Sequence, residues 1–514
     1  MDVNIKHAGK THNVVLNPEL PPLHFKEAIY QATGVPVDRM KVMVKGGVLK
    51  DDTDWKKINP KAGQTFMVIG AAGELPKPPE KPITFLEDME DSELAEALAM
   101  PVGLKNLGNT CYMNSTIQVI RAIPPLQSAL NKASTTPPLV LTIRDLYNSM
   151  SHTTEPVVPY AFLTALRQAH PQFGEMDRSG GGAPRGFAQQ DAEEAYSQIL
   201  NSLREVPDSD DPSKRFLDQW MAGEIQRETK LEVDPSETPE PPAITTEKIM
   251  KLECHISINT NYMATGISNS LKTTLTKHSP SLGHDASYIQ TTRLTRLPAY
   301  LTVHMVRFAW RADVGRKAKI MGLQRKVKFP TTYDALDITS EDLKGKLTKV
   351  NRRLVEIEKS RAERRKARLR RRGLAGGAEA QAMDVDDGEP EPVKRAKERE
   401  EIDNLVDPAI KADTGASWSG LYDLVAIVTH KGAAADSGHY IGFAKKSVFH
   451  DPSYSGAPVA DMDINALDTI EADEDWYKFD DDKVSVFPKD KLGTLDGGGE
   501  DSSAYVLVYR SRYV

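Results

Sequence analysis

One of the two cysteines in this chain of 514 residues stands where a catalytic nucleophile is expected. Cys111 follows the loop-forming sequence GLKNLGNT (residues 103–110) and precedes a stretch with apolar side chains at Ile117, Ile120 and Ile123. That spacing predicts a helix that begins near Cys111. Backbone N–H groups at a helix N-terminus stabilise a thiolate, so the pattern favours a reactive cysteine, although a lone cysteine is more often a packing residue.

Two remote segments supply the partners that a cysteine nucleophile needs. The apolar run LYDLVAIV (residues 421–428) predicts a strand, and His439 follows a small-residue loop to begin the next one. The stretch DWYKFDDDKVS (residues 475–485) predicts a short aromatic strand followed by three aspartates. Cysteine, histidine and aspartate in this order can provide a thiolate, its base and a carboxylate that fixes the imidazole tautomer.

Four sequence blocks together resemble the ubiquitin-specific protease family, whose members are cysteine hydrolases of the C-terminal linkage of ubiquitin. The blocks are GLKNLGNTCYMN (103–114), QQDAEE (189–194), RLPAYLTVHMVRF (296–308), and the pair SGHY (437–440) and WYKFDDDKVS (476–485). They occur in the family's order. The resemblance implies a papain-like catalytic domain with thumb, palm and fingers.

The resemblance also implies a role for each candidate catalytic residue. Cys111 would be the nucleophile, His439 the general base and then acid, and Asp480 the residue that orients His439. Asn106 matches the family's oxyanion-hole asparagine, whose side-chain N–H adds to a backbone N–H where charge develops on the tetrahedral intermediate. Asp481 could share the role of Asp480, and the sequence alone does not separate the two.

Substrate-binding residues are implied in the same way. In the family, the positions of Gln190, Asp191 and Glu194 contact the basic tail of ubiquitin, and Gly438 and Tyr440 flank the histidine. The i, i+3 spacing of the two acids would place both on one helix face, where they could pair with cationic groups. An ordinary acid-rich first turn of a helix is the alternative.

The first part of the chain predicts a separate domain that resembles ubiquitin. Alternating apolar residues indicate strands, and a short amphipathic stretch ending at glycine indicates a helix. This order of elements is typical of a ubiquitin-like β-grasp fold. The predicted elements are strands at residues 3–7 and 13–16, a helix at 25–34, and strands at 41–47 and 64–70.

We therefore expect an α+β protein with three parts. Residues 1–74 form the ubiquitin-like domain, residues 75–98 a proline-rich and extended linker, and residues 99–514 the ubiquitin-specific protease domain. No diglycine ends the first part, so we interpret it as an integral docking domain. Met43 falls where ubiquitin carries the isoleucine of its binding patch, which keeps such a docking surface plausible.

A charged and partly disordered insertion is expected within the protease domain, at residues 342–417. Residues 350–372 predict a charged helix, and the low hydrophobicity of residues 373–412 predicts disorder. The basic runs indicate nuclear import or binding to an acidic surface. A solvated, tolerated insertion is the alternative.

Composition narrows the classes of protein to which this chain could belong. The net charge of −7 gives no general attraction to nucleic acid, and two cysteines indicate a reducing compartment without disulfides. We find no apolar run of membrane-spanning length and no apolar leader, so neither membrane insertion nor secretion is expected. Many family members hold zinc with paired cysteines in their fingers, whereas this segment has only Cys254. We expect a packed strand residue there, and neither a metal nor another cofactor.

A ubiquitin-like domain directly before the protease domain is the arrangement of the proteasome-associated members of this family. Their resemblance to this chain implies hydrolysis of isopeptide and peptide bonds at the C-terminal glycine of ubiquitin, docking on the proteasome regulatory particle through residues 1–70, and a cytoplasmic and nuclear location. The small-residue loop KGAAADSG (residues 431–438) lies where such enzymes carry an inhibitory loop. The alternatives are a largely non-catalytic ubiquitin-binding regulator of the proteasome and a protease for another ubiquitin-like modifier.

Overall fold

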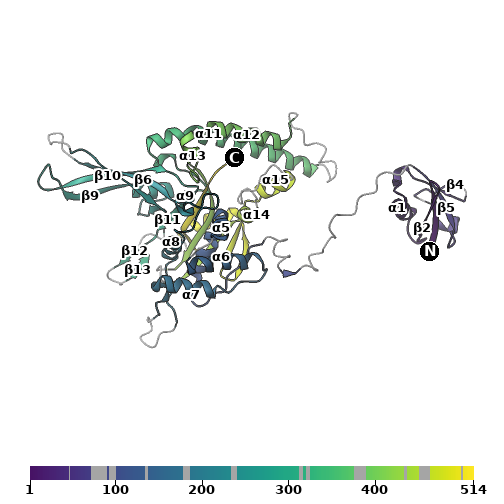
Figure 1. The fold of residues 1–514 in the computed structure, drawn as a ribbon, viewed down its shortest axis with the longest axis horizontal. Coiled ribbons are helices and arrows are strands. Elements are labelled where there is room, and N and C mark those ends of the chain that lie inside the picture. The colour runs from purple at the N-terminus through teal and green to yellow at the C-terminus, as the bar shows by residue number, and fades with distance from the viewer. Residues whose placement is uncertain are drawn as a thin grey trace. The chain divides into compact units, whose positions relative to one another are not determined.

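The chain forms two compact units in the computed structural model, Met1–Asp88 and Met89–Val514, and each is considered by itself (Figure 1). Within the described ranges, no helix combines the length and the apolar character needed to cross a membrane. The structure describes all residues except 46, 52, 71–89, 92–99, 134–136, 178–185, 233–239, 312–315, 320–324, 375–388, 433–436, 451–463, 499–501 and 514. The predicted linker at residues 75–98 lies almost entirely outside the described residues.

The N-terminal unit is a five-stranded sheet of order β2-β1-β5-β3-β4 with one main helix, which confirms the predicted β-grasp fold. Strand β1 runs parallel to β5, and the other neighbours are antiparallel. The short β4 and α2 were not predicted. The elements are β1 (Asp2–His7), β2 (Lys10–Val15), α1 (Pro22–Thr33), a 3₁₀ turn (Val37–Arg39), β3 (Lys41–Val44), β4 (Gly47–Val48), α2 (Trp55–Ile58) and β5 (Thr65–Ile69).

Aromatic packing joins α1 to this sheet. Phe25 and Ile29 lie one turn apart on α1 and are buried, as the helical period requires. The Phe25 ring lies 5.6 Å from the rings of both Trp55 and Phe66. Gly34, with a φ of 72°, ends the helix in the left-handed conformation that glycine adopts without strain. The unit therefore has a hydrophobic core of its own.

An eight-stranded sheet forms the centre of the second unit, in the order β18-β17-β16-β15-β19-β11-β8, with β14 paired to β15. Its two faces are covered by different hydrophobic clusters, because successive strand residues point to opposite sides. Val506 and Val508 contact the helical thumb, whereas Leu507 and Tyr509 contact the opposite cluster. The strands are β8 (Leu252–His255), β11 (Tyr300–Val306), β14 (Thr332–Asp334), β15 (Leu421–Lys431), β16 (His439–Lys445), β17 (Trp476–Asp480), β18 (Lys483–Phe487) and β19 (Ser503–Ser511).

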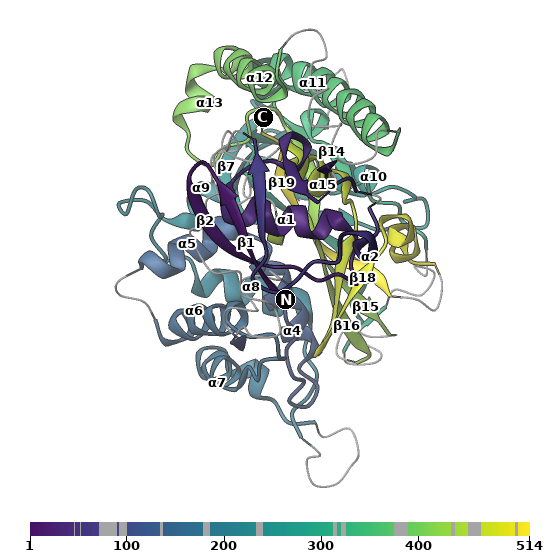
Figure 2. The same cartoon turned by 90° about the vertical axis from the view of Figure 1, so that its right-hand side faces the viewer.

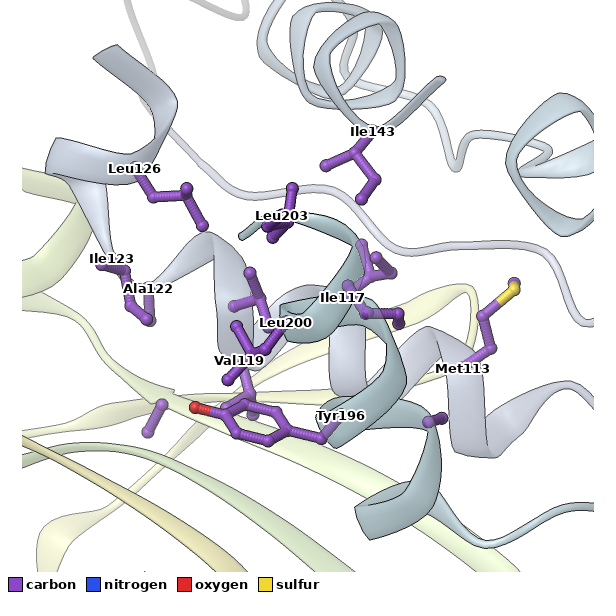
Figure 3. Close-up of a cluster of buried hydrophobic side chains, with 14 of the residues drawn as sticks. Met113, Ile117, Val119, Ala122, Ile123, Leu126, Ile143, Tyr196, Leu200 and Leu203 are labelled. Atoms are coloured by element: carbon purple, nitrogen blue, oxygen red, sulfur yellow. The ribbon is translucent and has the colours of Figure 1, made fainter. Parts of the chain in front are cut away.

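Helices that pack on the first face form the thumb. Figure 3 shows the contact of α4 with α8, in which Ile117 and Val119 meet Tyr196, Leu200 and Leu203. These side chains are nearly inaccessible to solvent, so α4 is held firmly against the sheet and its first residue has a fixed position. The helices are α4 (Cys111–Arg121), α5 (Pro124–Lys132), α6 (Pro138–Ser151), α7 (Tyr160–Ala169), a 3₁₀ turn (Pro171–Gly174), α8 (Ala192–Ser202) and α9 (Phe216–Trp220).

A second sheet of four strands, in the order β7-β6-β10-β9, extends away from the central sheet as the fingers (Figure 1). Its hairpins are antiparallel throughout. The elements of this region are β6 (Gly223–Leu231), β7 (Ala243–Ile249), α10 (Met263–Ser270), β9 (Lys272–His278), β10 (Asp285–Arg296), and the separate hairpin β12 (Phe308–Arg311) and β13 (Arg316–Lys319).

The charged insertion is largely helical. Helix α11 is longer than predicted, and α12 runs beside it in both views (Figures 1 and 2). The prediction of disorder was therefore wrong for residues 391–412, while residues 375–388 lie outside the described part. Ion pairs that a sequence pattern does not reveal hold α12 in place. The insertion contains α11 (Glu341–Leu374), α12 (Glu391–Leu405) and α13 (Pro408–Ala412). The other helical elements of this unit are a 3₁₀ turn (Leu336–Ile338), α14 (Ser447–His450), α15 (Ile464–Ala472) and a 3₁₀ helix (Lys489–Asp496).

Candidate active site

Cys111 is the first residue of α4, as the sequence predicted. Thr110 precedes it, and its carbonyl accepts the backbone N–H groups of Met113 and Asn114, which closes the first turn. The Thr110 hydroxyl does not cap the helix and instead accepts the backbone N–H of Leu107 at 2.9 Å. Cys111 is only 3% exposed, so its sulfur lies in a sheltered position at the positive end of the helix dipole.

His439 begins β16 and Asp480 ends the neighbouring strand β17. Nε2 of His439 lies 2.6 Å from Oδ1 of Asp480, and the imidazole also interacts with the thiol of Cys111. The hydrogen bond with Cys111, followed by that with Asp480, raises the pKa of His439 to about 9 against the effect of burial. These three groups can therefore hold a thiolate–imidazolium pair oriented by a carboxylate.

Gly438 permits the tight turn through which the chain enters β16. Its φ of 103° is unfavourable for other residues, and a Cβ there would lie 2.2 Å from the carbonyl oxygen of Lys431. A side chain at this position would force apart the two strands that place His439. Tyr440 is 1% exposed, with its ring 4.5 Å from that of His430, so it packs below the site. Residues 433–436 of the expected inhibitory loop lie outside the described part.

The three consecutive aspartates have three different sets of partners. Asp480 accepts from His439 and, through Oδ2, from the ammonium of Lys478 at 3.0 Å. Burial opposes its ionisation, but these two donors outweigh burial and hold the pKa of Asp480 below its usual range. Asp482 pairs with Lys105 at 3.0 Å.

Asp481 accepts from Asn106 and Asn114, each at 2.9 Å. The turn at Asp481 and Asp482 lies directly against the segment that precedes Cys111. The backbone N–H of Leu104 donates to the carbonyl of Asp481 at 2.9 Å, and a Cβ on Gly103 would lie 2.5 Å from the backbone of Asp482. Only glycine allows so close an approach.

The amide of Asn106 has a defined orientation. Its Oδ1 accepts the backbone N–H groups of Gly108 at 2.9 Å and Thr110 at 3.3 Å, so its nitrogen must be the end that donates to Asp481. One N–H of this nitrogen is used by Asp481, which leaves the other to stabilise an oxyanion.

His439, Asp480 and Asp481 also offer atoms within 4.8 Å of one another, the spacing of a metal site. Their carboxylate oxygens accept hydrogen bonds from Lys478, Asn106 and the imidazole instead. This chemistry suits an internal hydrogen-bond network, and we assign no metal to it.

The predicted tail-binding residues lie at the start of α8. Asp191 is the N-cap: its carboxylate accepts the backbone N–H of Glu193 at 2.8 Å and the hydroxyl of Tyr505 at 2.9 Å. It is 5% exposed and does not share an open helix face with Glu194, whereas Gln190 and Glu194 are partly exposed. Binding of a basic tail by these residues remains a prediction.

The sequence reasoning did not identify the neighbouring Glu193. Its carboxylate pairs with Lys251, and Lys251 also lies 3.3 Å from Glu253. Burial opposes ionisation of Glu193, yet His304 and Lys251 outweigh burial and hold its pKa below the usual range. The QQDAEE block thus carries a partly buried ion pair besides its helix cap.

A cavity of about 540 Å³ opens beside α8 at the root of the fingers, with Tyr196, Lys251 and Gln290 among its walls. Neither Cys111 nor His439 lines this cavity, so it is separate from the candidate catalytic residues.

The second cysteine has a different environment. Cys254 lies in β8 and is fully buried, and burial raises the pKa of its thiol to about 12. Its sulfur donates weakly to the carbonyl of Met263. This confirms the prediction of a packed strand residue.

Comparison with known proteins agrees with this geometry. The sequence profile described as ubiquitin carboxyl-terminal hydrolase matches residues 102–509, and that of the ubiquitin family matches residues 3–72. The chain belongs to the ubiquitin carboxyl-terminal hydrolase family. It is 39% identical to ubiquitin carboxyl-terminal hydrolase 6 of Schizosaccharomyces pombe over 99% of this chain and 98% of that protein.

Two further relatives have similar coverage. Identity is 34% to ubiquitin carboxyl-terminal hydrolase 6 of Arabidopsis thaliana over 100% of this chain and 99% of that protein. Identity is 29% to ubiquitin carboxyl-terminal hydrolase 14 of Caenorhabditis elegans, over 100% of this chain and 94% of that protein. The protein is therefore a cysteine-type deubiquitinase with an N-terminal ubiquitin-like domain, and ubiquitin and its conjugates are its partners.

Proposed function

We propose that this deubiquitinase works while docked on the regulatory particle of the proteasome, where it releases and recycles ubiquitin from substrates. It cleaves isopeptide and peptide bonds at the C-terminal glycine of ubiquitin with Cys111 as the nucleophile. The observation that carries the chemical part is the hydrogen bond between Asp480 and His439, whose imidazole interacts with Cys111 at the start of α4. The proposed partner implies a cytoplasmic and nuclear location.

The reaction follows from the arrangement of these groups. The Cys111 thiolate attacks the carbonyl carbon of the terminal glycine, and the oxyanion is bound by the Cys111 backbone N–H and the amide of Asn106. His439 then gives its proton to the leaving amine, which leaves a thioester on Cys111. Water, deprotonated by His439, hydrolyses the thioester and releases ubiquitin.

Tail recognition is proposed for the segments on both sides of the triad. Gln190 and Glu194 are partly exposed at the start of α8, where they can meet a basic tail. Asp191 would act mainly by fixing the N-terminus of α8, through its hydrogen bond with the hydroxyl of Tyr505. Gly438 would shape the opposite wall beside His439, and the buried Tyr440 would support that wall from below.

An exposed apolar row supports docking through the ubiquitin-like domain. Met43 on β3 is paired with Met67 on β5 and with Val48 on β4, and these side chains are 39%, 53% and 44% exposed. Ile69, on the same face of β5, is 53% exposed. Neighbouring exposed apolar side chains on one sheet face are typical of an interaction surface.

Two other functions are possible for this fold. A largely non-catalytic ubiquitin-binding regulator would not need the hydrogen bonds of His439 or the fixed orientation of Asn106. A protease for another ubiquitin-like modifier would use the same triad, and its substrate would differ only in the tail.

One experiment tests these possibilities. The full-length protein is treated with ubiquitin that carries a C-terminal electrophile, with and without proteasome, and the adduct is mapped by mass spectrometry. We expect labelling of Cys111, its loss in Cys111→Ala, normal labelling in the matched control Cys254→Ala, and faster labelling with proteasome. An adduct on Cys254, or a preference for another modifier's electrophile, would contradict the proposal.

A further inference from the structure

Two carboxylates lie within reach of one imidazole at the end of β17. The ligand atoms of His439, Asp480 and Asp481 all lie within 4.8 Å of one another, so either aspartate is close enough to compete for the ring. Both oxygens of Asp481 already accept side-chain amides, from Asn106 and Asn114. Which of the two aspartates orients His439 therefore depends on what holds the carboxylate of Asp480.

Lys478 is the residue that holds it. Lys478 and Asp480 are separated by two positions on β17 and so lie on the same face of the strand. The Lys478 ammonium lies 3.0 Å from Oδ2 of Asp480, while Oδ1 of the same carboxylate lies 2.6 Å from Nε2 of His439. One oxygen is therefore anchored to the strand and the other is aimed at the ring.

We propose that Lys478 is a positioning residue of the active site: it fixes the carboxylate of Asp480 so that Asp480, and not Asp481, orients His439. Without this anchor the Asp480 side chain turns about its Cα–Cβ bond toward solvent, because the Lys478 and Asp480 side chains are 31% and 34% exposed. Lys478 does not contact the scissile bond, so it acts on turnover and not on ubiquitin binding. The inference rests on the proposed roles of Cys111 and His439.

The test uses the full-length protein and the variant Lys478→Met. A partly exposed ion pair of this kind contributes about fivefold to a rate. We expect kcat for a fluorogenic ubiquitin C-terminal amide to fall about fivefold with KM unchanged. Lys478→Arg should recover most of the loss because its guanidinium can also hold the carboxylate. The matched control is Lys483→Met, since Lys483 lies opposite Asp480 in the hairpin register but is not ion-paired with it in the described part.

A double-mutant cycle separates positioning from a general structural effect. In the background Asp480→Asn, the rate of Cys111 labelling by the ubiquitin electrophile should be the same with Lys478 or with Lys478→Met. An equal loss in both backgrounds, or wild-type turnover of Lys478→Met, would overturn the inference. If Lys478→Met melts early, Lys478→Gln replaces it, and at least a twofold loss of kcat is required.

Failure of the proposed function gives a different result. In that case the wild-type protein itself would not be labelled on Cys111. If only the inference fails, the wild type is labelled on Cys111, and Lys478→Met is labelled either at the same rate or with the same loss in both backgrounds.

Discussion

At the scale of single residues, the active site depends on a division of work among adjacent acids. Asp480 is hydrogen-bonded to His439, Asp481 accepts the amides of Asn106 and Asn114, and Asp482 is paired on the surface with Lys105. Three side chains of one type therefore have different effects on the reaction, and their substitution should separate these effects.

Asp480→Asn should lower turnover far more than Asp481→Asn. The first change gives His439 the wrong tautomer, a loss of about 10⁴ in the serine-protease example. The second leaves an amide oxygen that still accepts one of the two asparagine donors. Turnover of a fluorogenic ubiquitin amide would be measured for both variants, and the reverse ranking would assign the orienting role to Asp481.

Asn106→Ala should reduce kcat about 10²–10³-fold, the usual effect of removing one oxyanion donor. The affinity for ubiquitin should change little, because the amide acts on charge that develops only in the transition state. Binding of ubiquitin to the inactive Cys111→Ala background, with and without Asn106→Ala, provides the control. A kcat within threefold of wild type would remove Asn106 from the chemistry.

Activity should decline as the pH rises through about 9, where His439 loses its proton. Its pKa is raised from 6.5 by the hydrogen bond with Cys111 and then by Asp480, with Asp481 and Lys478 as the other charged neighbours. The associated stability is fully present below pH 6.5 and is lost through about pH 9. A profile of kcat/KM from acid to alkaline pH would show this limb, and a limb at the ordinary histidine pKa would contradict the assignment.

At the scale of elements, a network of arginines and acids connects the insertion to the strand that carries Asp480. Arg368 on α11 makes a bidentate pair with the fully buried Asp468 on α15, at 2.7 and 2.8 Å. Glu471, also on α15, pairs with Arg365 and Arg395 at 2.7 Å. Because α15 leads into β17, the insertion supports the same strand that ends at the active site.

Arg368→Ala should lower the free energy of unfolding of the catalytic unit by about 3–5 kcal/mol, because it removes the bidentate ion pair from the buried charge of Asp468. The double change Arg368→Met with Asp468→Leu should be much less damaging. Urea unfolding followed by fluorescence would measure this. Lys346→Ala is the control on the same helix, since its pair with Asp342 is more exposed and should contribute little to stability. Equal losses at both positions would contradict a buried network.

The same network makes the stability of the insertion depend on pH. Burial opposes the ionisation of Glu391 and Glu471, but their arginine partners outweigh burial and lower the pKa of both carboxyls in the folded state. Their contribution to stability is therefore present above the ordinary pKa of 4.5 and is lost as the pH falls through the lowered values.

At the scale of the whole molecule, the candidate catalytic residues and the apolar row proposed for docking belong to two units with separate hydrophobic cores. The double change Met43→Lys with Met67→Lys should weaken proteasome binding and the proteasome's stimulation of hydrolysis, while basal hydrolysis stays unchanged. Both side chains are already exposed, so folding should be preserved. Hydrolysis would be followed across a proteasome titration.

Val15→Lys, on the distant strand β2, is the control for this change, because Val15 is 66% exposed but lies outside the apolar row. Activation curves that coincide for wild type and the double variant would show that this row is not the tether. A strong rise in basal activity would instead indicate that the ubiquitin-like domain inhibits the enzyme.

The sequence by itself determined the elements that carry the chemistry. Cys111 begins a helix, His439 begins a strand and Asp480 ends one, because apolar periodicity and small-residue loops are local signals. The β-grasp order of the first unit and the packing of Cys254 were predictable for the same reason.

Tertiary structure alone decided which polar groups meet. Asn106 and Asp481 are 375 positions apart, and Asp191 meets Tyr505 across 314 positions, so no local pattern reveals either hydrogen bond. Helix α12 is too polar for its own sequence to predict order. It is held by ion pairs such as that of Arg364 with Glu391, which form only when α11 lies beside it. Local propensity fixes the elements, whereas long-range pairing of buried charges selects how their side chains act together.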